Sequence, residues 1–384
     1  MGRETGLSVR SWIGIIVSVG KVPALVIVNE SVAICALKRY AADGDRGLWK
    51  KENKIAADSG KKVAIVGAGP AGLTAAFYLR KKGHGITVFD ANPAAGGMLR
   101  YGIPPYRLPR DILDREIADI LAPGIKLKTG WSLGKDFTLD QLTHNWFDAV
   151  FLAVGAQDSQ FISLDGCNRP DVIRGVEFLQ QVARGGDIRL KANVVVIGGG
   201  NVAVDAAMTA RRCGAADVKI VCLEGLGEMP TRSWLLKEAI AEGIEILPSW
   251  GPGRVISKDG KVTGLDLVEC SCLYDEKGEF CPKFGQTREC IPADQVIIAV
   301  GQAADLSFLK DGCPIKVERG RIAVNPDSLA TDVTGIYAGG DVTDAPGTVI
   351  DAIAAGRRAA SSIDQALGGS GGIGEILFTR GTPD

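Results

Sequence analysis

Three glycines at fixed spacing form a pattern that is typical of a pyrophosphate-binding turn. Gly67, Gly69 and Gly72 follow the apolar run 63–66, and a helical pattern continues from residue 73 to 82. In such a turn the first glycine permits a tight bend, the second lets the backbone approach a pyrophosphate, and the third lets the helix pack on the sheet. The helix N-terminus would hold the pyrophosphate, because its free N–H groups and its dipole favour negative charge.

A carboxylate completes this pattern. The apolar run 86–89 ends at Asp90, which lies 18 residues past Gly72. At the end of the second strand of a dinucleotide-binding fold, a carboxylate accepts hydrogen bonds from a ribose diol. Three spaced glycines alone are a weak signal, but strand, glycines, helix, strand and acid in this order predict a dinucleotide site.

The same constellation recurs 131 residues downstream. Gly198, Gly200 and Ala203 follow the apolar run 194–197 and open a helical pattern, and Glu224 follows the next apolar run. Alanine is an accepted small residue at the third position of this motif. The sequence therefore predicts two dinucleotide sites.

A further glycine pair lies near the C-terminus. Gly340 and Asp341 follow a short apolar strand, and a helical pattern begins near Thr348. This stretch is compatible with one more strand–helix unit. However, an acidic residue in this place is suited to meet a polyol or a pyrophosphate, and the helix behind it offers free N–H groups.

The composition limits the classes of protein to consider. A chain of 384 residues with 46% hydrophobic content is long enough for two or three domains. The formal net charge of -1 gives no overall field toward nucleic acid or an anionic membrane. The nine cysteines match neither a secreted disulfide framework nor a zinc ribbon, so we expect a reducing, cytoplasmic setting. The spacing of Cys270, Cys272, Cys281 and Cys290 suits neighbouring strands and a turn better than a metal cluster.

The two ends of the chain have their own character. The apolar stretch 12–28 is interrupted by Lys21 and Pro23 and is shorter than the about 20 residues needed to span a bilayer, so we expect no membrane anchor. Residues 31–42 form a helical pattern with Ser31 as a plausible cap, and 50–62 reads as a charged linker. The tail from Gly368 is rich in glycine and serine, and we expect it to be mobile.

From about Lys61 to Gly368 the chain resembles the flavoproteins with two dinucleotide-binding domains, and specifically the glutamate synthase small-subunit branch. That branch also includes the electron-entry region of dihydropyrimidine dehydrogenase and the large subunit of the NADH-dependent ferredoxin:NADP oxidoreductase. The motifs that carry the resemblance are VAIVGAGPAGL at 63–73, GGMLRYGIPPYRLP at 96–109, VIGGGNVAVDAA at 196–207, EMP at 228–230 and YAGGDV at 337–342.

The resemblance implies an α/β fold with two Rossmann-like domains. An NAD(P)-binding domain, 171–289, would be inserted into a discontinuous FAD-binding domain, 60–170 and 290–368. A helical remnant with a linker, 1–59, would precede them, and a flexible tail, 369–384, would follow.

The resemblance also implies two cofactors, FAD and NADH or NADPH, and assigns residues to them. The motif residues and their neighbours predicted to bind cofactors are Gly67, Gly69, Pro70, Ala71, Gly72, Asp90, Gly96, Gly97, Leu99, Arg107, Gly155, Gly198, Gly200, Asn201, Val202, Ala203, Glu224, Gly301, Gly340, Asp341 and Thr348. Those expected beside the flavin ring are Ile103, Pro104, Thr348 and Val349. Hydride passes directly between the two rings, so no catalytic acid or base and no metal is expected.

The leading interpretation is an electron-input subunit. It would take hydride from NAD(P)H onto FAD and pass the electrons to a partner, either a protein like the glutamate synthase large subunit or an iron–sulfur protein. The alternatives are a self-contained flavin reductase or diaphorase, and a non-catalytic FAD-binding scaffold. A carboxylate at Glu224 favours NADH, because it would bond a 2′-hydroxyl and repel a 2′-phosphate. Arg211 and Arg212 argue the other way, although we expect them to complement a helix C-terminus.

Two features depart from the family pattern. The family's N-terminal helical domain carries cysteines that bind iron–sulfur clusters, whereas here only Cys35 precedes residue 167. No Cys-x-x-Cys pair lies beside either glycine motif, which argues against a dithiol mechanism. His84 and His144, the two histidines, lie in no ligand-like cluster, and we expect surface or turn roles for both.

Overall fold

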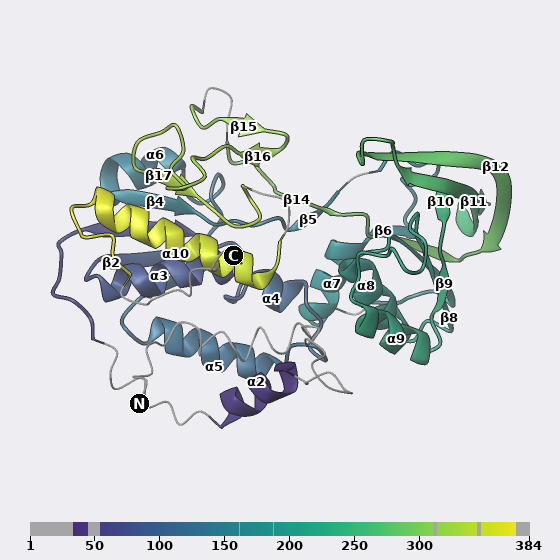
Figure 1. Cartoon of the computed structure of the whole chain (residues 1–384), viewed down its shortest axis with the longest axis horizontal. Coiled ribbons are helices and arrows are strands. Elements are labelled where there is room, and N and C mark those ends of the chain that lie inside the picture. The colour runs from purple at the N-terminus through teal and green to yellow at the C-terminus, as the bar shows by residue number, and fades with distance from the viewer. Residues whose placement is uncertain are drawn as a thin grey trace, which may run out of the picture. The chain divides into compact units, whose positions relative to one another are not determined.

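The chain divides into two units, one interrupting the other in sequence. The computed structural model describes residues 34–44, 54–160, 162–186, 188–309, 313–343 and 347–373. The described parts of 1–100, 105–156 and 304–384 form the first unit, and those of 101–104 and 157–303 form the second (Figure 1). The predicted α/β fold, with one domain inserted into a discontinuous other, is confirmed.

The boundaries between the units differ from the predicted ones. The second unit begins at 157 and ends at 303, whereas the sequence placed these limits at 171 and 289. The reason is strand pairing: β5 (Asp158–Ser159) pairs with β14 (Gln302–Ala303), and β13 (Gln295–Ile298) joins the second sheet. The apolar stretches 148–155 and 294–301 each contribute a strand to the sheet of their own unit, and the chain passes from one unit to the other shortly after each stretch.

A parallel sheet forms the centre of the first unit. Its order is β17 (Ile336–Ala338), β4 (Ala149–Leu152), β1 (Lys62–Val66), β2 (Gly85–Asp90) and β3 (Lys126–Thr129). Every neighbouring pair is parallel, and β1 is buried along its length after Lys62. The apolar run without alternation is what a strand covered on both faces requires.

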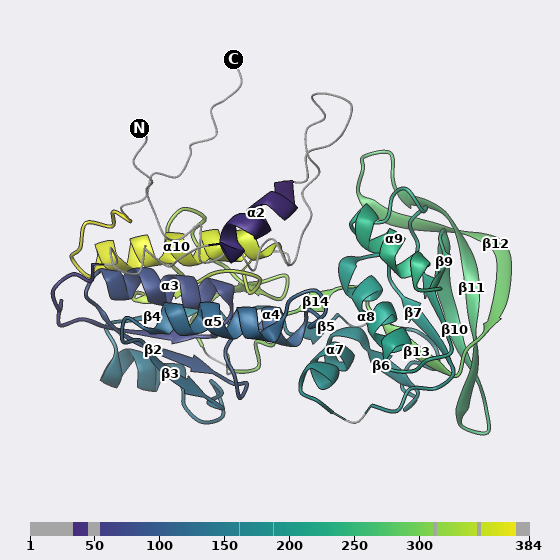
Figure 2. The same ribbon diagram turned by 90° about the horizontal axis from the view of Figure 1, so that it is seen from below.

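Helices and short strands surround this sheet. The longer helices are α3 (Pro70–Lys81), α5 (Arg110–Leu121) and α10 (Val349–Ala366). The shorter elements are α4 (Met98–Tyr101), α6 (Leu139–Gln141), a π-helical turn η2 (Leu142–Trp146), β15 (Val317–Glu318) and β16 (Arg321–Ile322). Helices α3 and α10 lie side by side in both views (Figures 1 and 2). A Cβ atom at Gly356 of α10 would overlap the carbonyl oxygen of Ala71, so the glycine permits this close packing.

The second unit repeats the arrangement. Its parallel sheet has the order β6 (Val172–Arg174), β13, β7 (Asn193–Ile197), β8 (Asp217–Val221) and β9 (Glu245–Leu247). Its helices are α7 (Gly175–Ala183), α8 (Asn201–Arg212) and α9 (Ser233–Ala241). In both units the strand before the glycine motif lies in the middle of the sheet.

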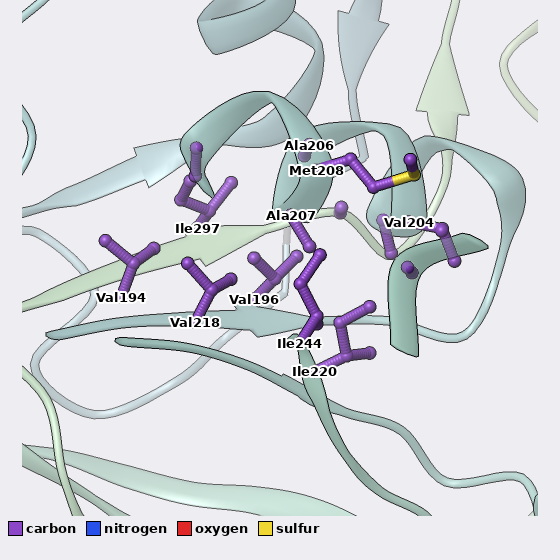
Figure 3. Packing of buried hydrophobic residues seen from close by; sticks show 14 of the residues in the cluster. Val194, Val196, Val204, Ala206, Ala207, Met208, Val218, Ile220, Ile244 and Ile297 are labelled. Carbon is purple, nitrogen blue, oxygen red and sulfur yellow. The ribbon is translucent and has the colours of Figure 1, made fainter. Parts of the chain in front are cut away.

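Strand β7 is buried on both faces. Val194 and Val196 point to the core beneath α8, where they pack with Met208 and the alanines of that helix (Figure 3). Val195 and Ile197 point to the opposite face, as the two-residue period of a strand requires, and pack in a second core.

An antiparallel sheet, which we did not predict from the sequence, covers this second core. It consists of β10 (Trp250–Lys258), β11 (Lys261–Tyr274) and β12 (Phe280–Pro292), which lie on the face of the parallel sheet opposite α8 and α9 (Figure 2). The four cysteines between residues 270 and 290 lie on β11 and β12, as their spacing predicted.

The described parts of the termini contain one helix, α2 (Ile34–Asp43). The apolar stretch 12–28, the proposed cap at Ser31 and residues 374–384 lie outside the described residues. Within the described ranges, no helix combines the length and apolar character needed to cross a bilayer.

Residues 369–373, the described part of the expected tail, are bonded to the end of α10. The Gly369 and Gly371 N–H groups donate to the carbonyl and the carboxylate of Asp364. The mobility of the tail stays a prediction.

Candidate functional site

The first glycine turn, residues 67–72, joins β1 to α3. Gly67 has φ +109°, and a Cβ atom there would overlap the carbonyl oxygen of Ala153 beyond β4. A Cβ atom at Gly72 would overlap the carbonyl oxygen of Gly67. Gly69 is the N-cap of α3, with Pro70 as the first helical residue. The backbone N–H groups that open α3 are therefore placed by contacts that only glycine allows.

A second segment lies directly against this turn. The Gly96 N–H donates to the Ala68 carbonyl at 2.8 Å, and Gly97 has φ +52°. A Cβ atom at Gly97 would lie 2.8 Å from the Cα of Gly69. Gly96 and Gly97, assigned to a cofactor from the family resemblance, thus lie beside the first glycine turn.

Asp90, at the end of β2, is buried and bonded to the turn itself. Its Oδ2 accepts from the Ala68 N–H at 2.7 Å and its Oδ1 from the Asn92 N–H at 2.8 Å. Burial raises the pKa of the Asp90 carboxyl, while these hydrogen bonds act in the opposite direction. Its carboxylate holds the turn in shape, and its contact with a ribose stays a prediction.

A third segment reaches the same turn from the C-terminal part of the chain. A Cβ atom at Gly340, which has φ +79°, would lie 3.2 Å from the Ala71 Cβ. Asp341 follows and accepts from the Gly347 N–H at 3.1 Å. Burial raises the pKa of the Asp341 carboxyl, and the Gly347 hydrogen bond partly opposes this. Segments around residues 70, 97 and 340 therefore meet at one place.

Helix α10 begins near Thr348, as predicted, with Thr348 as its N-cap, and an acidic side chain shares the helix N-terminus. Thr348 Oγ1 accepts from the Asp351 N–H at 3.3 Å, and Asp351 Oδ2 accepts from the Thr348 N–H at 2.8 Å. These hydrogen bonds hold the pKa of Asp351 below its ordinary value. Part of the positive end of the helix dipole is thus already matched by Asp351.

The second glycine turn, residues 198–203, joins β7 to α8 in the same way. Gly198 has φ +136°, and a Cβ atom there would overlap the carbonyl oxygen of Ala299 beyond β13. Gly200 is the N-cap of α8, and a Cβ atom there would meet nothing within 4 Å. The N-terminus of α8 therefore has room for a close-fitting anion.

Glu224 lies against this second turn. Its Oε2 is 2.5 Å from the position that a Cβ atom would take at Gly199. The half-buried carboxylate therefore stands beside the glycine backbone, where the ribose-binding acid of a dinucleotide fold belongs. Beside it, burial raises the pKa of the Cys222 thiol to about 12, so this cysteine stays a thiol at neutral pH.

Other residues singled out in the sequence also lie in the described part of the structure. Arg211 donates to the carbonyls of Ala215 and Ala216, which lie beyond the last residue of α8, so its expected role at the helix C-terminus stays a prediction. Arg212 instead pairs with Glu242. Of the remaining predicted site residues, Leu99 and Ala203 are buried, and Arg107 and Val202 are half-buried. Gly155 and Gly301 have positive φ. Val349 is the first residue of α10.

Ile103 and Pro104 belong to the segment that groups with the second unit. Their assignment to the flavin side of the protein stays a prediction. Among the described residues, no group of three or more histidine, cysteine or acidic side chains is arranged to hold a metal ion.

His84 was expected at the surface or in a turn, and the structure corrects this. The ring is buried, with 2% exposed, and its Nε2 lies 3.0 Å from the Asp364 carboxylate. Its Nδ1 lies 2.7 Å from Ser59 Oγ. Because a carboxylate only accepts, Nε2 carries the proton in this contact. No local sequence signal relates residues 280 positions apart. The His144 side chain lies outside the described part.

Comparison with known proteins agrees with this geometry. The family model for pyridine nucleotide-disulphide oxidoreductases matches residues 61–356. The NADP(+)-dependent formate dehydrogenase subunit beta of Moorella thermoacetica is 41% identical over 367 residues, covering 88% of this chain and 52% of that protein. The glutamate synthase [NADPH] small chain of Escherichia coli is 32% identical, covering 87% of this chain and 74% of that one.

A solved structure shows the same fold. Mycobacterium tuberculosis FprA in complex with NADPH matches with a TM-score of 0.69 at 20% identity, covering 80% of this chain and 84% of that one. The chain spans about half the length of the formate dehydrogenase subunit it matches. From the family model and the curated relatives together, the chain belongs to the pyridine nucleotide-disulphide oxidoreductase family, in the group of NAD(P)H- and FAD-dependent oxidoreductases that includes the glutamate synthase small chain.

Proposed function

We propose that this protein oxidises NADH by way of bound FAD and delivers the electrons to a partner protein. The observation that supports this most strongly is the pair of similar glycine turns. Gly67 lies against the carbonyl oxygen of Ala153, just beyond β4, and Gly198 lies against that of Ala299, just beyond β13. Each turn opens a helix whose N–H groups suit a pyrophosphate.

The residues present fit FAD at the first turn. Gly69 and Gly97 lie against each other, and Gly340 and Gly356 of α10 lie against Ala71 of the same turn. Without side chains, these glycines let the segments approach closely at the N-terminus of α3, whose backbone N–H groups would hold the FAD pyrophosphate.

The second turn fits the nicotinamide dinucleotide. The N-terminus of α8 would hold its pyrophosphate, and the carboxylate of Glu224 would accept hydrogen bonds from the adenosine ribose. When both cofactors are bound they supply a direct hydride transfer, so this chain's residues bind and orient rather than exchange protons.

Glu224 supports NADH as the donor. A carboxylate beside the ribose stabilises a 2′-hydroxyl and repels a 2′-phosphate. The names of the relatives from Moorella and Escherichia state NADP and NADPH, so the preference of this chain is a point at which it would differ from them.

The proposed acceptor is a protein. The relatives are named as subunits or chains of larger enzymes, which supports a role in passing electrons onward. The test compares ferredoxin-type iron–sulfur proteins with small dyes as acceptors for NADH oxidation. Faster turnover with an iron–sulfur protein, at equal concentration, supports the proposal. Reduction of dyes and oxygen alone would instead support a self-contained flavin reductase.

A further inference from the structure

Both ends of one loop in the second unit contact the second glycine turn. The loop, residues 225–232, follows Glu224 and leads into α9. At its start, the Glu224 carboxylate lies against Gly199. At its end, Thr231 and Arg232 are bonded to Asn201, the first residue of α8. The two ends of the loop are therefore held at Gly199 and at Asn201, two residues apart in the second glycine turn.

The contact at Asn201 has defined geometry. Its Oδ1 accepts from Thr231 Oγ1 at 3.0 Å and from the Arg232 N–H at 3.2 Å. Because a backbone N–H only donates, the atom facing it is the carboxamide oxygen. Thr231 is 9% exposed, so this contact is shielded from water on the side of the threonine. The side-chain oxygen of Asn201 is thus occupied by the loop.

The first half of the loop closes on itself. The Glu228 N–H donates to the Gly225 carbonyl at 2.8 Å, and the Gly225 N–H donates to Glu228 Oε2 at 3.3 Å. This turn does not fix the second half. The bonds to Asn201 tie that half to α8, next to the N–H groups suited to a pyrophosphate.

We propose that Asn201 is a positioning residue for the adenosine half of the dinucleotide: it holds loop 225–232 against the second glycine turn, so that the loop forms one wall of the binding site. The inference rests on the proposed function of that turn. A loop already in place need not be ordered when the ligand binds, so releasing it lowers affinity. The limiting rate of hydride transfer should not change, because the reacting ring is at the other end of the dinucleotide.

The test measures NAD⁺ binding by calorimetry on the purified holoprotein, together with the limiting rate of flavin reduction by NADH. Asn201→Ala is expected to raise the Kd about tenfold, as the loss of two hydrogen bonds implies, with the limiting rate within about twofold of wild type. Thr231→Val should raise the Kd as well, and Thr231→Ser should restore it. The double variant should bind no more weakly than Asn201→Ala alone, since both changes remove one contact. Thr263→Val, an exposed threonine on β11, is the matched control.

Hydrogen exchange supplies a readout that does not depend on activity. The Arg232 amide should exchange faster in Asn201→Ala than in wild type, without dinucleotide present. Unchanged exchange, or a Kd that rises in Asn201→Ala but not in Thr231→Val, would overturn the inference, because Asn201 would then contact the dinucleotide itself. A wild-type protein that binds no dinucleotide would overturn the proposed function, and this inference with it.

Discussion

At the scale of single residues, the two glycine turns are explained by two carbonyl oxygens. Gly67 is pressed against the Ala153 carbonyl and Gly198 against the Ala299 carbonyl, and both have positive φ. The motif spacing predicted that glycine is needed at these positions. The atoms that make it necessary belong to residues just beyond β4 and β13, more than 80 residues further along the chain, and the spacing did not identify them.

Replacing the first of these glycines tests that explanation. Gly67→Ala combines a left-handed backbone with overlap of the Ala153 carbonyl, and we expect it to lower the free energy of unfolding by about 3 kcal/mol. Gly60→Ala is the control, since Gly60 has φ +69° but nothing within 4 Å of a Cβ atom. It should cost only about 1 kcal/mol. Equal losses in urea denaturation would mean that the Ala153 contact is unimportant.

Glu224 is the residue on which the choice of dinucleotide depends. Glu224→Gln keeps the size of the side chain and removes the charge that repels a 2′-phosphate. We expect the ratio of kcat/KM for NADH to that for NADPH to fall about tenfold. Glu276→Gln, at the exposed end of the β11–β12 hairpin, should leave the ratio unchanged. A wild-type preference for NADPH that Glu224→Gln does not alter would contradict the assignment.

At the scale of elements, the N-terminus of α10 carries a pH-dependent contribution to stability. Hydrogen bonds from Thr348 lower the pKa of Asp351 below its ordinary value of 3.8. A carboxyl with a lowered folded-state pKa stabilises the fold above its unfolded-state pKa, and this contribution is lost as the pH falls through the folded-state value. Asp351→Asn should therefore cost about 1 kcal/mol at pH 7. The difference from wild type should shrink below about pH 4. A difference that is the same at pH 7 and pH 3 would show that the charge is not involved.

The elements that the sequence predicted well are those with a local pattern. The strands before both glycine turns, the helices after them and the start of α10 were all predicted close to their observed limits. The sheet of β10, β11 and β12 was not anticipated, because its long strands are partly exposed and show no clean alternation. The observed limits of the two units differ from the predicted ones because they depend on which sheet β13 joins. That pairing is between segments far apart in the sequence, and no local pattern indicates it.

At the scale of the whole molecule, the first unit is assembled from distant parts of the chain. His84 and Asp364 form a buried contact, and Ser59, which is exposed, contacts the other ring nitrogen of His84, so the three residues join the segment before β1 to the end of α10. Lys82 also lies 3.7 Å from the Asp364 carboxylate. Sequence reasoning could not find this contact, since each residue alone resembles an ordinary turn or surface position.

Removing the ring of His84 tests this contact. His84→Ala leaves the buried Asp364 carboxylate without its nearest cationic or N–H side-chain partner, and we expect a loss of about 3 kcal/mol in unfolding free energy. Ser59→Ala, which removes only the more exposed contact, should cost less than about 1 kcal/mol. Proteolysis near Gly371 should also become faster in His84→Ala. If His84→Ala unfolds like wild type, the contact does not hold the segment before β1 to the end of α10.

The central claim is that one chain binds FAD at one glycine turn and a nicotinamide dinucleotide at the other, and uses the second to reduce the first. The most direct measurement is anaerobic rapid mixing of the purified protein with NADH, followed in the visible flavin band. We expect the protein to contain FAD and the flavin band to be lost within seconds. If the protein retains FAD but its band persists with both NADH and NADPH, the nicotinamide dinucleotide does not reduce the flavin and the proposed function is wrong.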